Sequence, residues 1–450
     1  MKTLLPFLLL TTTHCCGTVN ALQQPRQKAV VVGSGPVGVA ASLILASKHN
    51  FDVTLLESAP ASATQTKYDP TKAFLYNVNM RGQRLTKQFP SMHQRMVERS
   101  VASKGFGGTT VTIVPADPEE PIPEAKANIA GDAAKDKIDG NDENNNNKSM
   151  PSGEKAANVG FWIPRHKMVK LMVEEIDEHN KKGVGGTIQL CTGQECVSVV
   201  PSTTDQGETV TLVTATDVVQ SSKDTVKEYT ANLVIGADGM NSKVRNCLAT
   251  APSGTWSTNC LPSTKFQPKK YTSPASYLRI KVLQFPPQFQ IPNGPNQPPL
   301  TTFSENIYAL RSAFTGPRSF LNLGLLPMKD NTAVRPTNII TRPDHEVWKI
   351  TDGQTMREYF QRAFPRFNFD DKDKEGNGGG MISNEEWERF AKAEGTRFPP
   401  CQYSPGLAVW DESGSTGVAL VGDSIHAFSP DIGQGVNAGL MDVVSNLANN

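Results

Sequence analysis

The chain has 450 residues, enough for two or three domains of about 150 residues each, and this length excludes a small scaffold held together by disulfides. The 45 Lys and Arg nearly balance the 44 Asp and Glu, so the net charge of +1 provides no overall field for nucleic acid or an anionic membrane. We therefore expect no nucleic-acid partner. The hydrophobic share of 38%, with 36 Gly and 32 Pro, predicts an ordered protein that carries loops or linkers.

Residues 1–21 have the features of a secretory signal peptide. Lys2 precedes a short apolar run from Leu4 to Leu10, and small and polar residues lead to an A-x-A-like cleavage site that ends at Ala21. The run is too short to cross a bilayer of about 30 Å as a helix, and no later segment has the apolar length that a span requires. We expect translocation into the secretory pathway, with a plastid or another organelle as the alternative destination, and no membrane span within residues 1–450.

A G-x-G-x-x-G motif follows a run of β-branched residues and opens a helix of small residues. Gly33 would allow the tight turn, Gly35 would let a pyrophosphate approach the backbone, and Gly38 would pack the helix against the strand. The next predicted strand ends at Glu57, whose carboxylate would accept hydrogen bonds from a ribose. This spacing predicts a dinucleotide-binding unit without distinguishing NAD from FAD.

The segment 117–157 contains almost no large apolar side chains and has four consecutive Asn, so it is predicted to be a disordered insert. Order resumes at 158, where Met168, Leu171, Met172, Glu175 and Ile176 recur at the period of one helix face, which forms an apolar stripe. The remaining predicted elements are a strand at 231–239, a proline-rich loop at 284–300, a helix at about 353–364 and a strand at 417–423.

Two distant segments complete a recognisable set of motifs. LVIGADGMNSKVRN at 233–246 and ALVGDSIHAFSPDIGQGVNAGL at 419–440 resemble the second and third motifs of the flavoprotein aromatic hydroxylases, the family of para-hydroxybenzoate hydroxylase. The resemblance implies an α/β fold with a GR2-type, Rossmann-like FAD-binding domain and a mixed-sheet substrate domain. The FAD-binding domain would consist of 28–116, 158–250 and 416–450, and the substrate domain would be 251–415.

The resemblance also implies roles for single residues of this chain. Asp423 would bind the ribityl or ribose hydroxyls of FAD, and Arg165 would contact its phosphates. Asp238 and Arg245 would lie near the pyrophosphate and the route of the reducing nucleotide. His426 is expected to pack and form hydrogen bonds rather than to act as a base.

The loop 430–437 would place its backbone amides along the isoalloxazine ring. A glycine-rich loop that enters a helix presents free N–H groups, which can stabilise negative charge on a reduced flavin. The residues assigned to this part of the site are Pro430, Gly433, Gln434 and Gly435 as catalytic residues, and Val436 and Asn437 as further cofactor-binding residues.

The implied activity is that of an FAD-dependent monooxygenase. It would use NAD(P)H and O2 to hydroxylate a small aromatic substrate through a flavin C4a-hydroperoxide, with the cofactor carrying the difficult chemistry. Two alternatives stay open: an FAD-dependent reductase or dehydrogenase of related fold, and a non-catalytic flavin-binding redox protein.

Within the family, FLYNVNMRGQRL at 74–85 and the run GQGVNAGLMD look like kynurenine 3-monooxygenase. The arginine and tyrosine that bind the substrate carboxylate in that enzyme have no clear match here. The cationic candidates are Arg81, Arg99 and Lys104. We therefore expect kynurenine to be a poor substrate.

No metal site is predicted. The segment 371–390 resembles an EF-hand loop, but two extra glycines move the closing Glu386 beyond the twelfth position of that loop. The chain ends at Asn450 within a predicted helix that has no stop signal, and we expect a further C-terminal portion.

Overall fold

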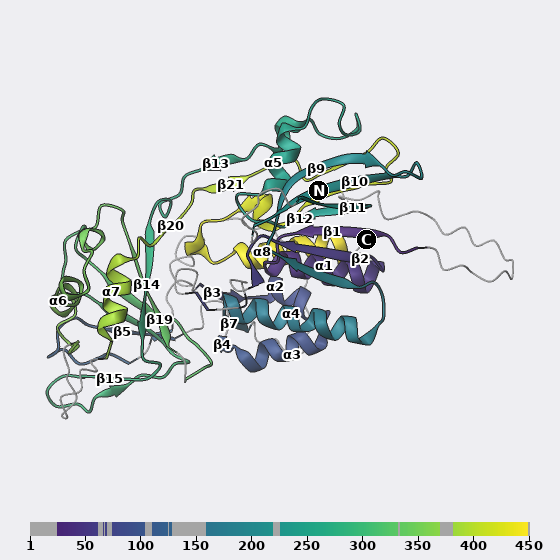
Figure 1. Cartoon of the computed structure of the whole chain (residues 1–450). Helices are drawn as coiled ribbons and strands as arrows, with labels where there is room; N and C mark the ends of the chain where they lie inside the picture. Colours follow the sequence, from purple (N-terminus) through teal and green to yellow (C-terminus); the bar gives the residue numbers. More distant parts are fainter. Residues whose placement is uncertain are drawn as a thin grey trace, which may run out of the picture.

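The computed structural model describes residues 25–61, 66, 68–69, 74–103, 110–124, 126–127, 159–218, 226–331, 334–369 and 381–448. The predicted signal peptide and most of the predicted insert lie outside these ranges. Within them, no helix is both long and apolar enough to cross a membrane. The chain forms two domains, one around the labels β1 and α1 and the other around β14 and α7 (Figure 1).

The first domain is built on a sheet which, in the described ranges, has six strands in the order β22-β23-β12-β1-β2-β8. All neighbouring strands are parallel except the pair of β22 and β23. The strands are β1 (Lys28–Val32), β2 (Asp52–Glu57), β8 (Ile188–Thr192), β12 (Leu233–Gly236), β22 (Ala408–Trp410) and β23 (Gly417–Leu420). Alternate side chains of β1 and β2 enter separate cores: Val31 and Leu55 face one, and Val30 and Leu56 face the other. The strands are apolar throughout because both faces of the sheet are covered.

Helices cover one face of this sheet (Figure 1). They are α1 (Pro36–His49), α4 (Arg165–Lys182) and α8 (Gly435–Val443), with α2 (Met80–Thr86) against α8 and α3 (Pro90–Arg99) against α4. Proline at the first position of α1 is well suited there because that position needs no N–H donor. The helix face predicted for α4 is confirmed, since its five members, Glu175 among them, are buried. A π-helical turn, Val444–Ala448, follows α8.

A second sheet covers the opposite face. Its three described strands are β9 (Gln194–Thr203), β10 (Thr209–Asp217) and β11 (Val226–Ala231), all antiparallel, and α5 (Lys243–Thr250) packs beside β9. Val199 and Val213 from this sheet join Val30 in one core. The result is a sheet with helices on one side and strands on the other.

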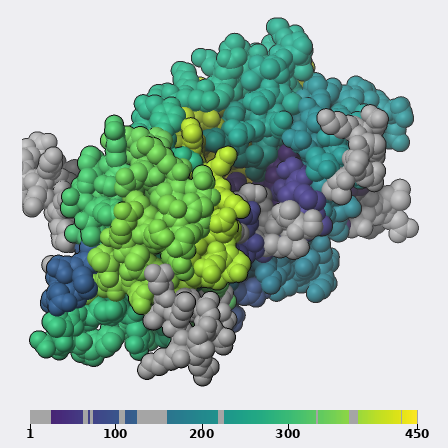
Figure 2. Space-filling view, turned by 60° about the vertical axis from the view of Figure 1, so that its left-hand side comes forward, coloured from purple at the N-terminus to yellow at the C-terminus, as the bar shows by residue number. Residues whose placement is uncertain are grey.

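Small sheets connect the first domain to the second. One sheet consists of β3 (Leu75–Val78), β7 (Gly160–Pro164) and β4 (Val101–Ser103). Another consists of β13 (Lys269–Tyr271), β21 (Cys401–Tyr403) and β24 (His426–Ala427), and its strands β13 and β21 run from one domain toward the other (Figure 1). The C-terminal segments shown in yellow lie where the green second domain meets the first (Figure 2).

The second domain has a mixed sheet, as predicted. Within the described residues its order is β20-β14-β19-β18-β17-β5-β6, and only the pair of β17 and β5 is parallel. The strands are β20 (Thr396–Arg397), β14 (Arg279–Phe285), β19 (Arg335–Thr341), β18 (Asn322–Leu325), β17 (Ile307–Arg311), β5 (Thr110–Val114) and β6 (Lys126–Ala127). Helices α6 (Gly353–Ala363) and α7 (Asn384–Lys392) supply aromatic side chains to the core, including Phe360 and Trp387, whose rings are 5.2 Å apart. The short pair β15 (Gln290–Ile291) and β16 (Leu300–Thr301) lies within the predicted proline-rich loop.

The domain limits differ from the expected ones at three places. Strand β5 belongs to the second domain rather than to the first part of the FAD-binding domain. The expected insert does not begin at Asp117, because the buried Arg366 donates hydrogen bonds to the carbonyls of Asp117 and Glu120. Phe266, expected in the substrate domain, is buried in a core of the first domain.

Candidate functional site

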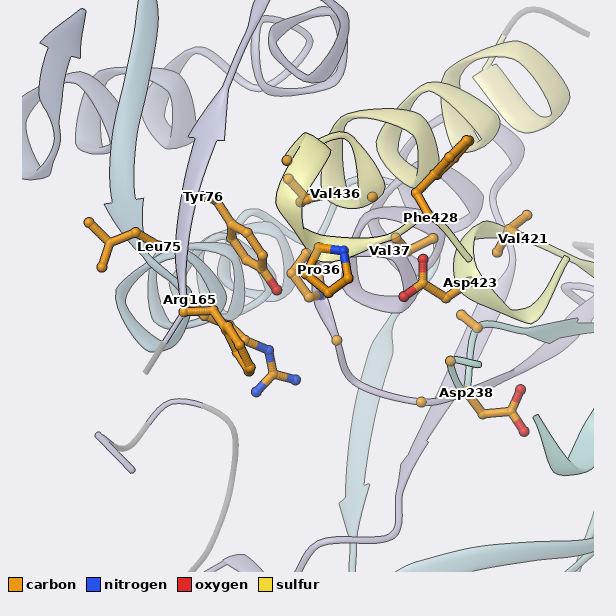
Figure 3. Close-up of a pocket in the computed structure, with 18 of the residues that line it drawn as sticks. Pro36, Val37, Leu75, Tyr76, Arg165, Asp238, Val421, Asp423, Phe428 and Val436 are labelled. Carbon is orange, nitrogen blue, oxygen red and sulfur yellow. The ribbon is translucent and has the colours of Figure 1, made fainter. Parts of the chain in front are cut away.

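A cavity of about 480 Å³ lies at the carboxyl ends of the parallel strands of the first domain. It is bounded by the turn between β1 and α1, by β3, by the start of α4, by the segment after β12 and by the loop that enters α8 (Figure 3). Most of the predicted site residues line it: Gly33, Gly35, Glu57, Arg165, Asp238, Asp423, Pro430, Gly433, Gly435 and Val436. The folded chain therefore brings together residues from the glycine motif and from the two later motifs, at 233–246 and 419–440.

The turn between β1 and α1 has no space for a side chain at Gly33 or Gly38. Gly33 has φ of +101°, and a Cβ atom there would lie 2.5 Å from the carbonyl oxygen of Ala237. Gly38 does not line the cavity; a Cβ on it would lie 1.8 Å from the carbonyl oxygen of Gly33, so this glycine permits the close approach of helix and turn. The N-terminus of α1 is thus held against the cavity, where its unpaired N–H groups suit an anion.

Glu57 at the end of β2 is buried and stabilises this turn. Its carboxylate accepts hydrogen bonds from the backbone N–H of Ser34 at 3.0 Å and from the Ser34 hydroxyl at 2.6 Å, and another from the N–H of Ala59 at 2.9 Å. A carboxylate has about four lone-pair positions. The predicted ribose contact of Glu57 stays a prediction, and the structure adds a second role for this residue as the support of the glycine turn.

Arg165 and Tyr76 enter the cavity from adjacent elements. Strand β3 pairs with β7, placing Leu75 opposite Pro164, and Arg165 follows directly as the first residue of α4. The Tyr76 hydroxyl points toward the guanidinium of Arg165 (Figure 3). Burial raises the pKa of Tyr76, and the nearby Arg165 lowers it in part. Arg165 thus brings a positive charge into the cavity, and its predicted contact with the FAD phosphates stays a prediction.

Asp238 lies where β12 ends and the approach to α5 begins. One carboxylate oxygen, Oδ2, accepts the N–H groups of Lys243 at 2.6 Å and Val244 at 3.1 Å. The other, Oδ1, is buried and has no hydrogen-bond partner among the described residues. Burial raises the pKa of Asp238, while these backbone groups and Ser242 lower it.

Arg245 has a structural role in the described part of the chain and does not line the cavity. It is buried and donates hydrogen bonds to the carbonyls of Ser424 at 2.9 Å and Met240 at 2.8 Å. It therefore holds the segment after β12 to the turn that carries Asp423.

Asp423, His426 and Asp442 form a group of titratable side chains at the opposite wall. Asp423 faces the cavity (Figure 3), and desolvation raises its pKa, with His426 lowering it and Asp442 raising it further. His426 Nε2 lies 2.8 Å from Asp442 Oδ2, which also accepts the N–H of Gly422 at 2.9 Å. Burial lowers the pKa of His426, but the hydrogen bond and charge of Asp442 outweigh burial and raise it overall. His426 packs and forms a hydrogen bond, as expected.

The loop before α8 divides into cavity-lining and supporting residues. Gly433 has φ of +60° and faces open space, and Gly435 begins α8, whose first N–H groups are therefore available at the cavity. Gln434 and Asn437 are not among the lining residues. Asn437 is fully buried; its side chain accepts the N–H of Asn79 at 3.0 Å and donates to the carbonyl of Asn77 at 2.9 Å. Asn437 therefore holds α8 to the β3–α2 connection.

The sequence did not identify every residue of the cavity. Phe74, Leu75, Tyr76, Phe428 and Ser429 also line it. The run FLYN was noted only as a resemblance, and nothing in its short aromatic pattern distinguishes a cavity wall from a core strand. Phe428 packs at a tilt against His426, with ring centroids 5.2 Å apart.

The fold is that of the FAD-binding monooxygenases related to para-hydroxybenzoate hydroxylase: a parallel sheet with a glycine turn at its strand ends, joined to a mixed-sheet domain. No family model matches the sequence, and no curated protein matches it. Among solved structures, the flavin-dependent monooxygenase PieE in complex with FAD and substrate has a TM-score of 0.55 at 17% identity, covering 93% of this chain and 56% of PieE. CtdE in complex with FAD has a TM-score of 0.50 at 14% identity over 93% of this chain and 83% of CtdE. A mutant of PqsL from P. aeruginosa also has a TM-score of 0.50, at 14% identity over 93% of this chain and 84% of PqsL.

Proposed function

We propose that this protein is an FAD-dependent monooxygenase that uses NAD(P)H and O2 to hydroxylate a small aromatic substrate. The observation that carries the proposal is the large cavity, in which the N-termini of α1 and α8, the guanidinium of Arg165 and the carboxylate of Asp423 face the same space. PieE and CtdE, which share the fold, have been solved with FAD. We further propose that residues 1–21 direct the chain into the secretory pathway.

The residues present suit FAD. The cavity of about 480 Å³ lies within the range of roughly 300 to 1,000 Å³ that is usual for ligand sites. The glycine turn at Gly33 leaves no room for a side chain, so backbone amides can approach a pyrophosphate.

Each part of the cavity would then have a distinct task. Arg165 and the N-terminus of α1 would hold phosphate groups, and Asp423 would accept hydrogen bonds from sugar or ribityl hydroxyls. The amides at the start of α8 would stabilise negative charge on the ring system. When bound and reduced, FAD supplies the chemistry that activates O2, and the protein contributes binding, orientation and exclusion of water.

The test is to purify the protein, measure its bound flavin, and screen aromatic compounds for stimulated NADPH oxidation. A monooxygenase would consume O2 in proportion to NADPH and release a hydroxylated product. A reductase or dehydrogenase would instead oxidise NADPH in proportion to its organic acceptor without O2. Protein with bound flavin that accepts electrons from neither NADH nor NADPH would contradict the proposal.

Kynurenine should stimulate this reaction only weakly. The guanidinium of Arg99 is paired with Glu174 at 2.7 Å, and Arg81 is exposed at the start of α2. Neither lines the cavity, and Lys104 lies outside the described residues. A buried carboxylate without a cationic partner costs several kcal/mol. Tightly coupled conversion of kynurenine to its 3-hydroxy product would contradict this expectation.

A further inference from the structure

A second, smaller cavity of about 200 Å³ adjoins the large one at the junction of the domains. The two cavities share Phe74 and Leu75 as lining residues. The first domain also contributes Pro164 and His166, and the second domain contributes Met328 and Val334. A molecule in the smaller cavity would therefore contact both domains and lie against the same residues that border the large cavity.

Of the ionisable side chains around the smaller cavity, Tyr68 and His166 are uncharged at neutral pH, and Lys167 is paired with a carboxylate. Burial raises the pKa of Tyr68 to about 12, so its hydroxyl stays protonated. Burial, with Lys167 and Lys170 adding to it, lowers the pKa of His166 to about 4, so the imidazole stays neutral. Lys167 is the cation on the wall, and its Nζ lies 3.1 Å from Asp330 Oδ2.

The remaining walls favour an aromatic ring. The rings of Tyr68 and His166 meet edge to face with centroids 5.5 Å apart, and Phe74 lies on the wall shared with the large cavity. Aromatic pairs in such geometry gain stabilisation beyond the burial of their area. An apolar cavity of roughly 150 Å³ is large enough for benzene, so the space here suits one substituted ring.

We propose that the smaller cavity binds the ring of the substrate, and that the substrate is a neutral single-ring aromatic compound without a carboxylate. The proposal rests on the proposed function, because it names the substrate class of that same active site. The pairing of Lys167 with Asp330 is what makes the site select against carboxylates: the cation on the wall of the cavity is already paired, so burying a carboxylate there would cost free energy.

The first test compares two ligands by isothermal titration calorimetry with the protein as purified. 4-Methylphenol and 4-hydroxybenzoate differ in a methyl group and a carboxylate at one ring position. We expect 4-methylphenol to bind at least tenfold more tightly. Equal binding, or tighter binding of 4-hydroxybenzoate, would overturn the proposal.

The location of the binding site is tested with a substitution that fills the smaller cavity and with a matched control. Val334→Trp should reduce the affinity for 4-methylphenol at least tenfold, because Val334 lines the cavity. Val97→Trp is the control, since Val97 has the same exposure of 44% on α3, away from both cavities. Unchanged binding by Val334→Trp would overturn the location.

The role of the pair of Lys167 and Asp330 is tested by removing the negative charge of Asp330. Asp330→Asn should raise the affinity for 4-hydroxybenzoate at least tenfold and leave that for 4-methylphenol within threefold. Glu305→Gln is the control, because it breaks the exposed pair of Lys329 and Glu305 at 2.9 Å, outside the cavity. An equal change for both ligands would overturn the role of the pair. Calorimetry needs no flavin, and FAD binding is measured separately on the same samples. A failure to bind FAD would contradict the proposed function, whereas it would not contradict binding of the ring in the smaller cavity.

Discussion

Asp423 is the carboxylate that faces the large cavity next to the N-terminus of α8. Burial raises the pKa of Asp423, and the charge of His426 offsets part of this effect. Donors from a bound ligand would relieve that desolvation. The proposed role of Asp423 thus follows from its surroundings as well as from the GD motif in the sequence.

Substitution of this residue tests that role. Asp423→Ala should weaken FAD binding about ten- to a hundredfold, because losing a hydrogen bond to a charged group costs roughly 1.5 to 3 kcal/mol. Fluorescence titration of the flavin-free protein with FAD measures the change. Asp205→Ala, at an exposed position between β9 and β10, serves as the control. FAD affinity equal to that of the unaltered protein would remove Asp423 from the cofactor site.

The Asp442 carboxylate pairs with His426 and also accepts a hydrogen bond from the N–H of Gly422, so it supports the turn that carries Asp423. The folded-state pKa of His426 is raised, so folding favours its protonated form. The stabilisation is complete below the unfolded His pKa of about 6.5 and disappears as the pH rises through the higher folded-state pKa.

Asp442→Asn should therefore lower the free energy of unfolding by roughly 1.5 to 3 kcal/mol at acidic pH near 5.5, with a smaller loss at alkaline pH near 9. Urea unfolding at the two pH values measures both differences. Asp205→Asn should change neither. A loss of the same size at both pH values would show that the pairing with protonated His426 contributes no stability.

The sequence predicted which single residues lie together where those residues are close to one another along the chain. Gly33, Gly38 and Glu57 belong to one continuous strand–turn–helix–strand unit, so spacing alone predicted their neighbourhood. Tyr76 and Asp442 could not be assigned in this way. Their positions depend on β3 pairing with β7 and on α8 packing beside the glycine turn, which are contacts between distant parts of the chain.

Among the elements, β5 shows most clearly what local patterns could not predict. It pairs in parallel with β17, almost 200 residues further along the chain, and no local signal shows which sheet a short apolar strand will join. The helices α4 and α6 were predictable because each has an apolar stripe, and α1 was predictable because it directly follows the glycine turn.

The segment after β5 gives a test at this scale. Ile122 packs against the second-domain core, and its N–H donates to the side-chain oxygen of Asn293 at 2.7 Å. Replacing 121–155 with a Gly/Ser linker should lower the free energy of unfolding by about 1 to 3 kcal/mol relative to a matched variant that replaces only 128–155. Denaturant unfolding of both variants measures the difference. Equal stability would show that the contacts of 121–127 contribute nothing measurable.

For the whole molecule, the cavities explain the need for two domains. The first domain supplies the glycine turn and the loop before α8, and the second adds Met328 and Val334 to the smaller cavity beside it. The order of the three motifs predicted the first domain and its FAD-type fold. The smaller cavity could not be predicted, because its walls come from four separate segments whose meeting depends on how the domains pack.

The most direct test of the account is to supply isotopically labelled O2 to the purified protein with NADPH and 4-methylphenol, and to analyse the product by mass spectrometry. We expect one labelled oxygen atom in each molecule of hydroxylated product, with no label when the labelled oxygen is supplied as water instead. NADPH oxidation that forms no oxygenated product, or a product whose new oxygen comes from water, would contradict the assignment as a monooxygenase.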